Sequence, residues 1–109
     1  MRAGDLDQQV RFEAESRADD GYGGSELTWQ ALGTHWAQVT AVRGAERAQA
    51  MSVEYPFDYK VRVRRVAALR TAKRLVWTSN GDMELRVVAV EDNGPRAGDM
   101  WFHCRAGVR

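Results

Sequence analysis

The chain has 109 residues, 44% hydrophobic and 28% charged, with a formal net charge of +1. This length is that of one domain, and the composition is that of a folded globular protein rather than a disordered one. Both charge signs are spread along the sequence, which argues against the concentrated basic footprint of a strong nucleic-acid binder. We therefore expect a single domain over residues 1–109.

The single cysteine, Cys104, rules out an internal disulfide and a CxxC zinc pair. No apolar run reaches the roughly 18 residues of a membrane span, and the polar start MRAGDLDQQ lacks the apolar core of a secretion signal. We expect a protein made in the cytoplasm, with no membrane partner.

Two strands are predicted in the first 42 residues. In residues 8–14, QQVRFEA, Val10 and Phe12 alternate with polar residues, the period of a half-buried strand. A second strand is predicted from Leu27 onward through residues 34–42, THWAQVTAV, which are rich in aromatic and β-branched types. Gly33 is expected to form a bulge or bend within it.

Between these strands lies DDGYGGSELTW, residues 19–29. It lacks the lysine and the following helix of a phosphate-binding loop, and it has no GxGxxG pattern. The segment therefore predicts a wide turn, in which glycines with positive φ bring Trp29 back to the fold. Asp19 and Asp20 are interpreted as part of a solvated turn rather than a cation site.

Residues 43–52, RGAERAQAMS, are good helix formers and predict a short helix. A helix below about 12–15 residues is marginal alone, so it must be held by packing or by a neighbour, or remain mobile. Pro56 forces an extended Tyr55 and ends this segment.

The clearest strand signal is FDYKVRVRR, residues 57–65. Its apolar face comprises Phe57, Tyr59, Val61 and Val63. The other side presents a basic stripe of Lys60, Arg62, Arg64 and Arg65.

A hairpin and a closing strand complete the predicted fold. RLVWTSNGDMELRVVAV, residues 74–90, predicts a hairpin with a type I′ turn at Asn80-Gly81, and Met83, Leu85, Val87 and Ala89 are aligned on one face. Residues 92–99 are turn formers, and in the strand that follows Met100, Phe102 and Cys104 alternate with Trp101, His103 and Arg105. About six strands, with one short helix in the long loop between the second and third long strands, predict a small, mainly β barrel or sandwich.

No catalytic set is visible. His35 and His103 lack metal-ligand spacing, and Cys104 alternates with apolar residues, as a buried small side chain does. The sequence predicts no enzyme activity, metal or cofactor; an enzyme would have only these residues and scattered acids to use.

The basic stripe leaves one alternative open, a small β-barrel nucleic-acid-binding module. Strand alternation sends Phe57 and Tyr59 to the face opposite the basic groups, so stacking and phosphate contact would not share a surface. Pairing with acids, for which Glu13, Glu15, Glu84 and Glu91 are candidates, or solvation is favoured. Salt-sensitive binding of single-stranded DNA would distinguish the alternative.

Several segments occur in an order that is typical of one family. They are GDLDQQVRFE (4–13), DDGYGGSELTW (19–29), HWAQVTAVRGAE (35–46), KVRVR (60–64), ELRVVAVED (84–92) and a closing CRAG. The chain resembles the head-tail joining proteins of tailed phages, also called head closure, stopper or head completion proteins. The DGYGG…W and WA.V elements in this order are the specific part of the likeness.

The resemblance implies a small β-barrel subunit of a ring, expected to have twelve copies, between the portal and its adaptor above and the tail protein below. Such a ring closes the head after packaging, encloses passing DNA and docks the tail. The subunit would be made in a host bacterial cytoplasm and end in the virion neck. Phage, prophage and gene transfer agent all remain possible sources.

The resemblance also directs attention to two groups of residues. The segment Val42 to Pro56 matches the family's long excursion, and it is a candidate for subunit contacts or a channel plug. Its candidate residues are Arg43, Glu46, Arg47, Gln49, Met51, Glu54 and Tyr55. Tyr22, Trp29 and Trp36 are candidates for packing, and we expect Tyr22 to pack on its own barrel or on the next subunit.

Overall fold

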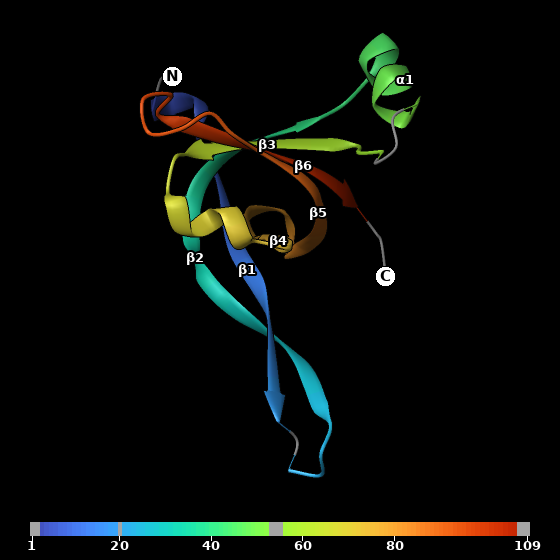
Figure 1. The fold of residues 1–109 in the computed structure, drawn as a ribbon. Helices are drawn as coiled ribbons and strands as arrows, with labels where there is room; N and C mark the ends of the chain where they lie inside the picture. Colours follow the sequence, from blue (N-terminus) through green and yellow to red (C-terminus); the bar gives the residue numbers. More distant parts are fainter. Residues whose placement is uncertain (1–2, 20, 53–55, 107–109) are drawn as a thin grey trace.

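The computed structural model describes residues 3–19, 21–52 and 56–106, and in them six strands close into one antiparallel barrel (Figure 1). The strands are β1 (Gln8–Asp19), β2 (Ser25–Ala41), β3 (Tyr59–Arg64), β4 (Arg74–Trp77), β5 (Met83–Asp92) and β6 (Asp99–Ala106). The helix α1 (Gly44–Ser52) joins β2 to β3, and 3-10 turns η1 (Ala3–Asp5), η2 (Ala67–Thr71) and η3 (Thr78–Asn80) complete the elements. The predicted fold class is confirmed. No helix within these described ranges is long and apolar enough to cross a membrane.

The barrel order is β1-β2-β3-β6-β5-β4, and β1 also pairs with β4 to close it. The inward residues of β1, β3 and β6 are those predicted from alternation. Phe12 and Phe102 meet at the centre with their ring centroids 5.1 Å apart. Fully burying such a side chain contributes about 1.5–3 kcal/mol each, so these alternating positions dominate the fold's stability. The fully buried residues include Val10, Phe12, Val61, Val63, Leu75, Leu85, Met100, Phe102 and Cys104.

β1 and β2 continue beyond the barrel as a two-stranded ribbon. β4 pairs only with residues 10–13 of β1, and β3 pairs only with residues 37–41 of β2. Residues 14–19 therefore pair with residues 25–30 alone; we call this hairpin, residues 14–31, the arm. The molecule measures 49 × 30 × 29 Å, and Figure 1 shows the arm, blue and cyan, as the long projection.

The arm corrects the prediction of a short first strand and a wide turn. β1 runs to Asp19 and β2 begins at Ser25, so most of the predicted turn is strand. The alternating pattern ends at residue 14 because a ribbon that is solvated on both faces has no reason to alternate.

Bulges occur in β2 and β5. Phe12 pairs with Gly33 and Glu13 with Ala31, which leaves Leu32 as an extra residue and confirms the predicted irregularity at Gly33. In β5 the register shifts between Val87 and Ala89. The predicted alignment of Ala89 with the core is wrong, because this second bulge turns Ala89 outward and Val90 packs on the core instead.

The β4–β5 connection is longer than the predicted two-residue turn. Residues 78–82 connect the strands, and the left-handed residues are Gly81 (φ 66°) and Asp82 (φ 59°) rather than Asn80-Gly81. The hydroxyl of Thr78 donates to the Gln9 carbonyl at 3.0 Å, and the Gln9 N–H donates to the Ser79 hydroxyl at 2.8 Å. These bonds to β1 favour the longer loop.

Gly33 offers a test of the bulge at the root of the arm. Its φ is 116°, and a Cβ there would lie 3.2 Å from Nε2 of His35. Gly33→Ala should lower the free energy of unfolding by about 1–3 kcal/mol, measured by urea titration. Gly4→Ala is the control, because a Cβ at Gly4 meets nothing within 4 Å. Equal stability of the two variants would contradict the strained geometry.

Candidate assembly surfaces

Helix α1 stands away from the barrel. Figure 1 shows it at the end of the molecule opposite the arm tip. Arg43, Glu46, Arg47 and Gln49 are all exposed, and Lys60 of β3 pairs with Glu46 at 2.9 Å. Met51 lies in the helix, but its side chain is outside the described part of the structure, as are the whole of Glu54 and Tyr55. The predicted short helix is confirmed, and its described side chains do not contribute to the barrel core.

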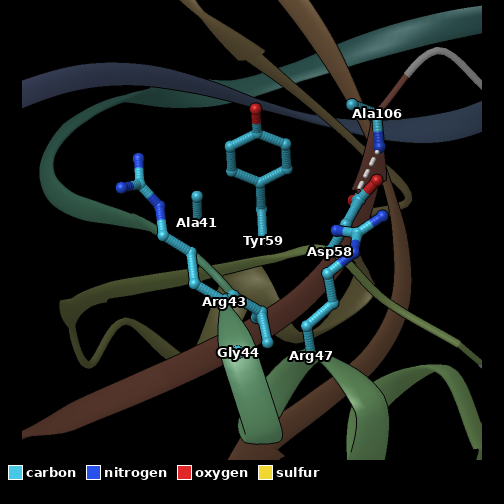
Figure 2. Close-up of a pocket in the computed structure, with 8 residues that line it drawn as sticks. Ala41, Arg43, Gly44, Arg47, Asp58, Tyr59 and Ala106 are labelled. Atoms are coloured by element: carbon cyan, nitrogen blue, oxygen red, sulfur yellow. Dashed lines mark hydrogen bonds between the residues drawn. The ribbon is translucent and has the colours of Figure 1, made fainter.

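A pocket of about 490 Å³ lies where α1 leaves the barrel (Figure 2). Arg43, Arg47 and Tyr59 are among the residues that line it. Asp58, also in the lining, accepts from the Ala106 N–H at 3.0 Å through its carboxylate. The Asp58 carbonyl accepts from the Val42 N–H at 3.0 Å, and its own N–H donates to the Cys104 carbonyl at 2.9 Å. These bonds fix the base of the helix to the barrel end.

Two of the three aromatic candidates are exposed. Tyr22, at the arm tip, is 95% exposed, so the expectation that it packs on its own barrel is wrong. A ribbon as long as this one carries the tip away from the barrel. Trp36, on the barrel part of β2, is 56% exposed. Trp29 is half-buried on the arm, and the guanidinium of Arg74 lies 4.2 Å from its ring centroid.

Glu13 joins the arm to the barrel. The residue is only 7% exposed, and its carboxylate accepts from Arg74 at 2.6 Å and from Arg11 at 3.1 Å. Arg74 thereby connects the buried acid to the ring of Trp29, so one cation holds both strands of the arm root. The prediction of Glu13 as a candidate partner of the basic stripe is wrong, because barrel closure places Glu13 beside Arg74 of β4 instead. Sequence reasoning missed Arg74, because only strand order reveals its neighbours.

The basic stripe is largely paired with acids, but not with the predicted ones. Arg62 pairs with Asp99 at 2.7 Å and Arg65 with Asp92 at 2.8 Å, because β6 is the neighbour of β3 and Asp92 ends β5. Lys60 pairs with Glu46 of α1. Arg64 is exposed.

An aromatic ring does lie among these basic groups. Lys60 and Arg62 are 5.6 and 5.3 Å from the ring centroid of Trp101 on β6. The alternation of β3 alone could not reveal this neighbour. Trp101 is half-buried beside cations that already have carboxylate partners, which makes the surface a paired one rather than an open stacking platform.

The Asp92 carboxylate contacts three segments of the chain, at Arg65, Gly94 and Arg70. It accepts two bonds from Arg65, at 2.8 and 3.2 Å, and one from the Gly94 N–H at 3.1 Å, and it lies 3.6 Å from Arg70 of η2. The Arg65 hydrogen bonds, followed by that of Gly94, hold the pKa of Asp92 below its ordinary value. The carboxylate is therefore a stabilising group only while it is ionised.

The side chains of Cys104, His103 and His35 each pack against their own neighbours in the barrel. Burial raises the pKa of the Cys104 thiol, opposing thiolate formation. His103 stacks on Phe57 with ring centroids 4.2 Å apart, and burial lowers its pKa. His35 meets the edge of Phe12 at 5.7 Å. Among the described residues, no three His, Cys, Asp or Glu side chains are grouped to hold a metal ion.

The fold and these surfaces define a class of small closed β-barrel subunits that carry an exposed arm at one end and an exposed helix at the other. Residues 1–107 match the family described as phage head completion protein. The chain belongs to this family of head-tail joining structural proteins.

Two solved structures are similar to this chain. A chain in the virion of a native gene transfer agent particle is 30% identical with a TM-score of 0.62, and the match covers 94% of this chain and 96% of that one. The solution structure of a Shigella flexneri 2a protein is 18% identical with a TM-score of 0.80, covers 100% and 99% of the two chains, and supports the fold alone. No curated protein matches the chain.

The arm root can be tested at Arg74. Arg74→Met leaves the Glu13 carboxylate with one fewer cation, so the free energy of unfolding should fall by about 1.5–3 kcal/mol. The substitution also uncovers Trp29, so tryptophan emission should shift to longer wavelength. Arg86→Met is the matched control, because Arg86 is exposed and lies opposite Arg74 in the β4–β5 register. Equal changes in stability and in tryptophan emission for the two variants would contradict the role of Arg74 in holding the arm root.

The Asp92 network predicts a pH dependence. Because the folded-state pKa of Asp92 lies below the ordinary 3.8, its contribution is present above that value and is lost as the pH falls through the lowered pKa. Asp92→Asn should therefore be less stable than the wild type at neutral pH, and the difference should shrink as the pH falls below the ordinary pKa of 3.8. Urea midpoints across this range measure it. A difference that stays constant with pH would show that ionised Asp92 contributes nothing specific.

Proposed function

We propose that this protein is a structural subunit of the neck of a phage or phage-like particle. Copies of it form a ring, of twelve subunits by the family's pattern, between the portal or its adaptor and the tail. The ring closes the head after DNA packaging, surrounds DNA without reading its sequence and provides the surface on which the tail docks. Subunits are made in the bacterial cytoplasm and are incorporated into the virion neck.

The observation that carries this proposal is the match over nearly the whole chain. Residues 1–107 fit the head completion family, and the related gene transfer agent chain is part of a virion. A likeness that covers 94% of the chain leaves little sequence for a separate function.

The exposed extensions support assembly. The arm tip and helix α1 lie at opposite ends of the barrel (Figure 1), and their described side chains are exposed and outside the barrel core. A two-stranded ribbon is at best marginally stable in water on its own, so the arm is well suited to be completed by a neighbour. We assign Arg43, Glu46, Arg47 and Gln49 to subunit or channel contacts at the helix end.

The nucleic-acid-binding alternative loses support from the ion pairs. Lys60, Arg62 and Arg65 each have a carboxylate within 3 Å, so phosphate binding would first have to break these pairs. DNA contact in the ring is therefore expected to be weak and independent of sequence.

Particles assembled without the protein test the proposal. Electron microscopy should show filled or leaky heads that lack tails, and wild-type protein supplied in trans should restore tailed particles. Normal tailed, infective or DNA-transferring particles in the absence of the protein would refute the neck assignment. A monomeric state of the isolated protein is compatible with it, because the ring can require the portal as a template.

A further inference from the structure

The arm and the rest of the chain carry opposite charge. Residues 14–31 contain one base and four acids, a formal charge of −3, whereas the remaining residues contain fifteen bases and eleven acids, a charge of +4. Opposite charges on two parts of one chain favour association of the arm of one copy with the body of another.

The arm tip combines apolar and acidic groups. Tyr22 is 95% exposed and Leu27 is 44% exposed. Glu26 is also exposed, on the face of the ribbon opposite Leu27, because the two residues are successive in β2. The exposed Tyr22 ring, with the Glu26 carboxylate on the adjoining strand, is suited to an aromatic surface that is bordered by arginines.

Such a surface lies on the barrel wall where β1, β2 and β3 run side by side. Trp36 is 56% exposed and pairs with Gln9 of β1. Arg11 lies two residues further along the same outward face of β1, with a side chain that is 40% exposed. Ala37 pairs with Val63, so the exposed Arg64 lies next to Trp36 on the other side.

We propose that the arm tip of one copy docks on the Trp36 surface of the next copy, with Tyr22 against the indole and Glu26 beside Arg64. The contact rests on the proposed ring. The tip projects away from the barrel that carries its own Trp36, so the contact is between copies (Figure 1). The arm tip and the Trp36 surface are different parts of the chain, so the interface is head-to-tail. Such an interface closes into a ring when the rotation from one subunit to the next permits it.

The small size of the contact has a consequence. An arm tip and one tryptophan surface bury less than the roughly 1,200 Å² of a stable interface. The contact alone therefore holds copies together only where a template or other contacts bring them close.

Cysteine cross-linking in purified particles tests the contact. One chain carries Tyr22→Cys and a second carries Trp36→Cys; Cys104 is buried and does not compete. Mild oxidation should give disulfide-linked dimers only when the two chains are mixed, and a ladder when one chain carries both substitutions. Tyr22→Cys mixed with Ala48→Cys on the exposed helix is the control and should give none.

A charge reversal adds a second readout. In the chain that carries both cysteines, Arg64→Glu should reduce the linked fraction about fivefold, because an exposed ion pair becomes a like-charge pair. Glu26→Arg added to that chain should restore the linked fraction. Both substituted positions are exposed, so the fold should tolerate them.

The outcomes separate this inference from the proposed function. Particles that contain the protein and carry tails, but give no link between positions 22 and 36, would overturn the arm contact and leave the neck assignment intact. Dimers formed by Tyr22→Cys alone, or by the Ala48→Cys pair in place of the Trp36→Cys pair, would also overturn it. Absence of the protein from particles would overturn both.

Discussion

The buried carboxylate of Glu13 is the interaction on which the rest of the molecule depends. It sits where β1 leaves the barrel, beside the β1–β4 pairing that closes the sheet, and it accepts from Arg11 and Arg74. A carboxylate that is 7% exposed needs such partners. Because Arg74 also covers Trp29, the same cation fixes the direction of the arm. The Glu13–Arg74 ion pair therefore contributes both to the closure of the barrel and to the position of the arm.

The residues that stabilise the barrel are different from those exposed on the arm tip and helix α1. The core combines alternating apolar residues of β1, β3 and β6 with Leu75 of β4 and Leu85 of β5. Ion pairs at its edge, such as Arg65 with Asp92, connect loops to it. The exposed arm tip and helix α1 contribute little to that core. The proposed assembly fits this division, because the arm tip and α1 are available for contacts with neighbours without disturbing the core.

Much of the barrel was predictable from the sequence because half-buried strands must alternate. Val61 and Val63, like Met100 and Phe102, face inward as their period of two requires. The arm was not predictable, since a ribbon with two solvated faces lacks this period. Ala89 was misplaced because one extra residue in β5 reverses the faces. The partners of Arg62 and Arg65 depended on β6 lying next to β3, a fact of strand order that no local pattern contains.

The central claim is that this barrel forms a ring at the particle neck. A reconstruction of purified particles at a resolution that traces strands tests it most directly. The account predicts a ring of copies of the six-stranded barrel between portal and tail, with every arm directed at a neighbouring subunit. A neck that is fully built from other chains, with this protein absent or located elsewhere in the particle, would contradict it.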